Sequence, residues 1–150
     1  MTTPLIPHRR LSRRLLLPLL FLAPLAMASE AYDLTFQGDA SFGGPHGGQA
    51  VQAALVDAAS GEVLETMSGT VSADADPAFS FVFPGALSTS GSYEVHYWID
   101  SNFGGGSEGR CDPKGTDHQW RVALDASGEA VTHVESHAPG AQSDVCATFE

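Results

Sequence analysis

Basic residues are scarce over most of this 150-residue chain. Four of its seven lysines and arginines lie among the first 14 residues, so residues 29–150 hold three basic residues against 18 acidic ones. A surface this acidic repels phosphate backbones and anionic lipid headgroups. The composition therefore excludes nucleic acids and charged membrane surfaces as partners and favours cations.

The chain also lacks an apolar run long enough to span a bilayer. Its longest run, Leu15 to Ala28, is interrupted by Pro18 and Pro24 and is shorter than the roughly 20 residues that a spanning helix needs. It follows a cluster of arginines and ends on Ala26-Met27-Ala28, which is typical of a cleaved export signal. We expect residues 1–28 to be this signal and residues 29–150 to form one periplasmic or secreted domain with no membrane insertion after cleavage. Ser12-Arg13-Arg14 resembles a twin-arginine signal, and an ordinary secretory signal fits equally.

Cysteine is limited to Cys111 and Cys146. An even pair in an exported domain predicts a disulfide, which would remove both thiolates from chemistry. The alternative is a blue-copper site, in which one free cysteine joins two histidines.

Helical periodicity is absent, and alternation of apolar and polar residues dominates. Tyr32, Leu34 and Phe36 share one face of a strand, as do Phe79, Phe81 and Phe83. The alternation predicts an all-β fold, a two-sheet antiparallel β-sandwich of seven or eight strands. The expected strands are residues 32–37, 50–57, 62–70, 78–83, 92–100, 118–124, 130–136 and 145–149.

Glycine, proline and aspartate mark the turns between these strands. Asp57 to Gly61 and Asp125 to Gly128 each follow an apolar strand and are expected to be hairpin connections. Pro84-Gly85 and the glycine-rich stretch of residues 43–48 are further turn signals.

The only long irregular stretch runs from Ser101 to Asp117, and loops of this length in compact domains are usually functional or disordered. Its Asp-x-Asn start, followed by glycines, supplies oxygen ligands on a turning backbone, which suits calcium. Cys111 stands where an EF-hand would place its closing glutamate, so a calcium site would need acids from the distal arm. The alternative is a solvated polar loop. The candidate calcium ligands are Asp100, Asn102, Glu108, Asp112 and Asp117.

The segment from Tyr93 to Val122 resembles an element of small secreted β-sandwich modules, immunoglobulin-like or transthyretin-like, in which an Asp-x-Asn turn leads to an Asp-His-x-Trp-Arg strand. The resemblance implies a sandwich fold and no agreed activity. The insertion from Gly104 to Arg110 departs from the tighter turn of those modules. The matching positions are Asp100, Asn102, Asp117, His118, Trp120 and Arg121.

Histidine supplies the other candidate site. Strand alternation places His118 on the same face as Trp120, toward the core, and His96 with Trp98 on the outward face. Imidazole suits copper and zinc. We expect a transition-metal site made of His46, His118 and either His137 or His133. The alternative is a core histidine at position 118 and surface histidines elsewhere.

Enzyme signatures are weak. Gly105 to Gly109 matches a nucleophile-elbow pattern, but that motif works only between a strand and a helix of a larger α/β fold. The sequence thus favours a non-enzymatic, metal-binding exported protein. A second hypothesis is a carbohydrate- or protein-binding module with a calcium-stabilised loop and an exposed surface of Tyr97, Trp98 and Phe103. A third is a structural part of a larger complex.

Overall fold

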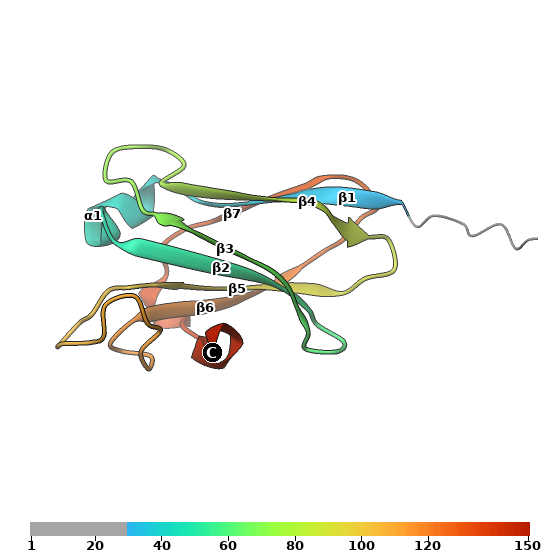
Figure 1. Ribbon diagram of the computed structural model, residues 1–150. Helices are drawn as coiled ribbons and strands as arrows, with labels where there is room; N and C mark the ends of the chain where they lie inside the picture. The colour runs from blue at the N-terminus through green and yellow to red at the C-terminus, as the bar shows by residue number, and fades with distance from the viewer. Residues whose placement is uncertain (1–29) are drawn as a thin grey trace, which may run out of the picture.

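The computed structural model describes residues 30–150, so the predicted export signal lies outside the described residues. These residues form a two-sheet β-sandwich, as predicted (Figure 1). No helix among them is long and apolar enough to cross a membrane. The seven strands are β1 (Ala31–Gly38), β2 (Ala50–Asp57), β3 (Val63–Thr70), β4 (Phe79–Ser88), β5 (Tyr93–Ile99), β6 (His118–Leu124) and β7 (Val131–Glu135).

The two layers have different sizes. One sheet has the order β4-β1-β7 and the other the order β3-β2-β5-β6. All neighbouring strands run antiparallel except β1 and β7, which pair in parallel with Leu34 opposite Val131. This parallel pair arises because the chain crosses from β6 to the other sheet and runs along the free edge of β1.

The core lies between the sheets and is rich in aromatic side chains. Phe36 of β1, Phe81 of β4 and Tyr97 of β5 are 0–5% exposed and belong to this core. Tyr97 also stacks on Trp120 of β6, with ring centroids 4.9 Å apart. Removal of this apolar surface from water is the main stabilising term of the fold.

Three local predictions were wrong. Residues 145–149 do not form a strand: Cys146–Phe149 is a 3-10 helix, η3, that lies against Trp98 on the outer face of β5. Asp125 to Gly128 is a crossover between sheets, not a hairpin. Pro84-Gly85 lies inside β4 at an irregularity opposite β1, where the Gly85 amide donates to Asp33. The Asp57 to Gly61 hairpin between β2 and β3 is as predicted.

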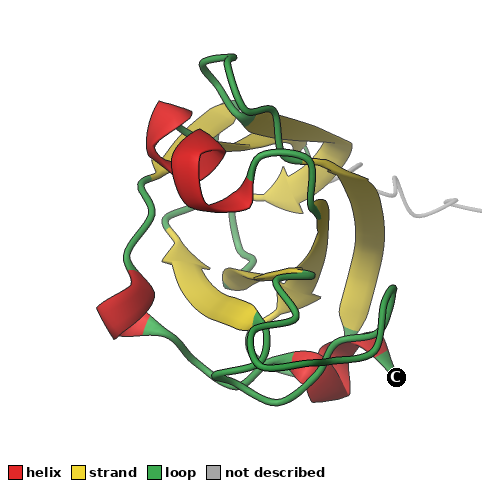
Figure 2. Ribbon diagram, turned by 90° about the vertical axis from the view of Figure 1, so that its left-hand side faces the viewer, coloured by secondary structure: helices red, strands yellow, loops and turns green. Residues whose placement is uncertain are grey.

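One end of the sandwich gathers several loops (Figure 2). The 3-10 helix η1 (Ala40–Phe42) and the short helix α1 (Gly43–His46) follow β1 there, the 101–117 loop leads into β6, and a segment containing η2 (Pro139–Ala141) follows β7. Gly43 and Gly47 hold α1 tightly against Ala73, because a Cβ at either position would lie within 2.7 Å of that residue's atoms.

Candidate metal centre

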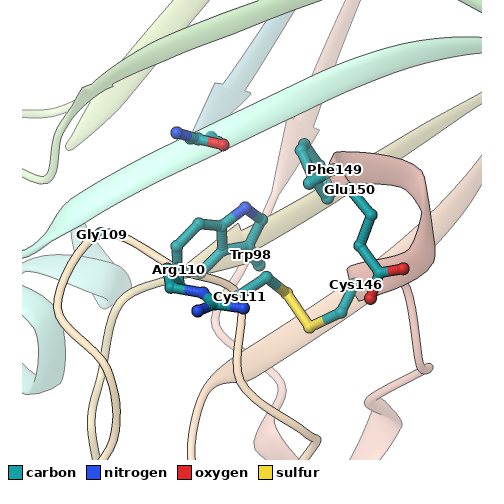
Figure 3. A pocket seen from close by; sticks show the side chains of 8 residues that line it. Trp98, Gly109, Arg110, Cys111, Cys146, Phe149 and Glu150 are labelled. Carbon is teal, nitrogen blue, oxygen red and sulfur yellow. A yellow bond between two sulfur atoms is a disulfide. The ribbon is translucent and has the colours of Figure 1, made fainter.

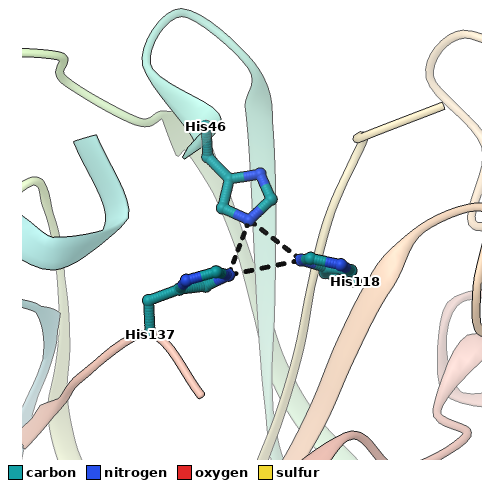
Figure 4. Close-up of side chains that lie close together, drawn as sticks. All are labelled: His46, His118 and His137. Carbon is teal, nitrogen blue, oxygen red and sulfur yellow. Dashed lines mark hydrogen bonds between the residues drawn. The ribbon is translucent and has the colours of Figure 1, made fainter. Parts of the chain in front are cut away.

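Three histidines from separate elements meet at this end of the sandwich (Figure 4). His46 ends α1, His118 begins β6, and His137 follows β7 by two residues. The Nε2 atom of His46 lies 3.0 Å from Nδ1 of His118 and 3.1 Å from Nε2 of His137. The third side of the triangle, between His137 Nε2 and His118 Nδ1, is 3.4 Å. This group could hold a transition-metal ion such as copper or zinc.

Hydrogen bonds alone cannot satisfy this triangle. Each nitrogen of a neutral imidazole is either an N–H donor or a lone-pair acceptor. Three nitrogens in mutual contact must include two of the same kind. Any placement of protons therefore leaves two donors, or two acceptors, facing each other. One cation at the centre would accept all three lone pairs. Nitrogens bound tetrahedrally to zinc at about 2.0–2.1 Å are about 3.3–3.4 Å apart, close to the separations seen here.

Gln49 orients the His46 ring. Its Oε1 atom lies 2.7 Å from Nδ1 of His46, and an amide oxygen can only accept a hydrogen bond. The proton of neutral His46 therefore sits on Nδ1, which leaves the Nε2 lone pair directed at His118 and His137. Such an outer partner fixes the tautomer of a metal-binding histidine.

Substitution of Gln49 by alanine is expected to weaken metal binding by about tenfold, since loss of an orienting partner typically costs 10- to 100-fold in affinity. Competition with a chromophoric chelator would measure the change. Gln37→Ala is a suitable control, because Gln37 bonds to Ser80, away from the histidines. Equal affinities of the Gln49 variant and the wild type would contradict this role.

A polar network positions His137. Its backbone amide donates to Ser41 Oγ at 2.8 Å, and Asp39 accepts hydrogen bonds from Ser136 and Ser41. These hydrogen bonds lower the pKa of Asp39, and the bond from Ser136 has the largest effect. On the other side, Trp120 Nε1 donates to the Ala138 carbonyl at 3.0 Å. The segment after β7 is thus held at both sides of His137.

Burial favours the neutral form of the three imidazoles. Desolvation lowers the pKa of His46, which is fully buried, to about 4, and it lowers the pKa of His118 and His137 as well. Metal ions bind the deprotonated ring, so the histidines are ready to bind near neutral pH without first releasing protons.

The metal-free protein is expected to lose stability as pH falls from 6.5 to about 4. In this window the unfolded chain, with its ordinary histidine pKa of 6.5, binds a proton that folded His46 does not. The loss from His46 is on the order of 3 kcal/mol. Urea unfolding at pH 7 and pH 4.5 would measure it, and His46→Gln should show a smaller pH dependence than the wild type. An equal dependence in both proteins would contradict the assignment.

His133 and His96 lie outside this group. The ring of His133 packs on Phe36 at 5.9 Å, and its Nε2 lies 2.6 Å from Glu135. His96 was expected to face outward, and it does lie on the outer side of its sheet, but η3 covers it and leaves it only 6% exposed. Its Nδ1 contacts Thr148 and its Nε2 contacts Glu94.

The carboxylates of the acidic loop bind the backbone of the loop itself. Asp117, fully buried, accepts the backbone amides of Ser101, Asn102 and Asp112. Asp100 accepts from Asn102 and Gly109, and Asp112 accepts from Ser107. Glu108 is exposed. The carboxylates thus fasten the loop backbone, and calcium binding is unsupported.

Cys111 and Cys146 form the predicted disulfide, which excludes a cysteine ligand for copper. A pocket of about 350 Å³ lies beside it on the outer face of the sheet, lined in part by Trp98, Arg110 and Phe149 (Figure 3). Tyr97, Trp98 and Phe103 were expected to form an exposed recognition surface. This prediction was wrong for Tyr97, which is fully buried, and for Trp98, which is 2% exposed; only Phe103 is exposed. Trp98 instead forms a wall of this pocket.

Sequence reasoning missed the residues around the histidines. Gln49 follows His46 by three residues, and this short spacing across a tight turn was the available signal. Ser41 and Asp39 carried no signal of their own, because they reach His137 only through the fold.

No protein-family model matches this chain, and no significant match was found among curated proteins or solved structures. The resemblance to immunoglobulin-like and transthyretin-like modules therefore stays a prediction.

Proposed function

We propose that this chain is an exported, non-enzymatic protein that binds one copper or zinc ion through His46, His118 and His137. The observation that carries the proposal is the triangle of ring nitrogens, 3.0–3.4 Å apart, that no arrangement of protons satisfies. The acidic surface adds to it by attracting cations.

Export to the periplasm or the cell exterior is part of the proposal. A disulfide persists in oxidising compartments and is rare in the cytosol. The apolar run at residues 15–28 supplies the signal that such export requires.

Metal retention tests this function. The protein would be produced with its own export signal and no histidine tag, loaded with copper or zinc, dialysed and subjected to elemental analysis. We expect about one equivalent of metal in the wild type and none in His46→Gln/His118→Gln.

The double variant His96→Gln/His133→Gln is the matched control, because it also removes two histidines but leaves the triangle intact. It should retain metal as the wild type does. Failure of the wild type to retain either metal would overturn the proposal, as would equal retention by His46→Gln/His118→Gln.

A further inference from the structure

Three aromatic rings surround the histidine triangle, and each contacts two of its members. Phe42 lies 5.4 Å from His137 and 6.5 Å from His46, measured between ring centroids. Trp120 lies 5.6 Å from His118 and 5.9 Å from His137. Phe103 lies 4.9 Å from His118 and 6.3 Å from His46. We call Phe42, Phe103 and Trp120 the aromatic collar.

In the described part of the chain, no carboxylate makes direct contact with the three rings; the nearby buried Asp117 accepts backbone amides instead. Among residues 30–150, no carboxylate is within hydrogen-bonding distance of the three imidazoles, whose only partners outside the triangle are Gln49 and Ser101. The two other described histidines are different, since His96 pairs with Glu94 and His133 with Glu135. The contrast is marked in a chain with this excess of acidic residues. A bound ion would thus have three neutral imidazoles and no carboxylate in direct contact, within a largely aromatic environment.

Apolar surroundings favour an ion of low charge. The cost of placing an ion in apolar surroundings rises with the square of its charge, so a divalent ion costs about four times as much as a monovalent one. Zinc also takes four ligands in almost all of its sites, and three protein ligands leave it needing a water molecule. A hydrophobic shell controls the access of that water.

Resting on the proposed metal-binding function, we infer that the aromatic collar makes the three-histidine centre selective for monovalent copper over zinc and divalent copper. Monovalent copper adds a single charge and can be bound by three neutral nitrogens alone. The collar is therefore a specificity-determining element, not only a part of the core.

Phe103 offers the cleanest way to test this role. Phe42 and Trp120 are 0% and 3% exposed, so their substitution would disturb the core, whereas Phe103 is 45% exposed. Phe103 lies in the 101–117 loop. The backbone there is held by hydrogen bonds from the Phe103 amide to the Thr116 carbonyl and from the Asn102 amide to Asp117. A change at Phe103 alters the solvent side of the collar and leaves the packed side intact.

The test compares the wild type with Phe103→Asp, which places a carboxylate beside His118. Affinities for monovalent copper and for zinc would be measured anaerobically by chelator competition, with ascorbate as the reductant because it spares the disulfide. Leu64→Asp is the matched control, because it adds the same charge at a position outside the collar. Leu64 lies on β3 and is 44% exposed, much like Phe103.

We expect the wild type to bind monovalent copper more tightly than zinc. Phe103→Asp should shift the ratio of the two affinities toward zinc by about tenfold or more and lower the reduction potential of bound copper, and Leu64→Asp should change neither. An unchanged ratio in Phe103→Asp, or a wild type that prefers zinc, would overturn the inference while leaving the metal site in place. A wild type that binds no metal would overturn the proposed function as well.

Discussion

Substitution of His118 by alanine is expected to weaken metal binding by at least about a hundredfold. Loss of a residue that only orients a ligand already costs 10- to 100-fold, and His118 supplies one of just three nitrogens. The two remaining histidines would bind an ion with an open site and weaker affinity. Competition titration with a chelator of known affinity would measure the difference.

The control for this variant is His133→Ala. His133 and His118 are both partly buried strand residues, but His133 lies outside the triangle, and its loss should leave the affinity within a few-fold of the wild type. Circular dichroism would establish that both variants are folded. If the two variants bound metal equally well, the assignment of His118 as a ligand would be wrong.

Replacement of both cysteines by serine is expected to lower the free energy of unfolding by about 4 kcal/mol. The disulfide joins residues 35 positions apart, and a crosslink closing a loop of this length restricts the unfolded chain by that amount in the loop-entropy model. Because a domain of this size is stable by only about 5–15 kcal/mol, the effect should be large. Urea unfolding of the metal-free proteins would measure it.

The same loop contains His118 and His137, so the disulfide and the metal site constrain one segment of chain. A bound ion stabilises only the folded state, and added metal should therefore recover part of the lost stability. The matched control is the same serine pair combined with His118→Ala, for which metal should recover little. Unfolding at the same urea concentration with and without the cysteines would contradict the stabilising role of the disulfide.

Much of the fold could be predicted from alternation alone, because a sandwich core requires apolar residues at every second position. Phe79, Phe81 and Phe83 illustrate this: all three lie on the inner face of β4. The strand expected at residues 145–149 is absent, and η3 lies there instead, tied by the disulfide at Cys146 and by contact of Phe149 with Trp98. Local periodicity does not report such tertiary constraints.

The histidine group was only partly predictable. Strand alternation placed His118 toward the core, and the glycine-rich stretch of residues 43–48 placed His46 in a turn. The sequence left His133 and His137 as alternatives because both lie on one face of an extended segment. The structure brings His137 to the triangle because the chain leaves β7 at Glu135 and folds back to Ser41, a long-range contact that no spacing encodes.

The pairing of strands also depended on contacts that are distant in sequence. Asp57 to Gly61 and Asp125 to Gly128 look alike, yet only the first is a hairpin. The second is followed by β7, whose partner is the edge of β1 almost 100 residues earlier. Turn residues predict where the chain changes direction, but the strand that the following segment pairs with depends on contacts distant in sequence.

X-ray absorption spectroscopy of the metal-loaded wild type, produced without a histidine tag, tests the central claim most directly. The account predicts an inner shell of three imidazole nitrogens at about 2.0 Å with no sulfur. His133→Ala should give the same spectrum, and His118→Ala should lose one nitrogen from the shell. A shell made of oxygen or sulfur, or a nitrogen shell unchanged by His118→Ala, would show that the metal is bound elsewhere.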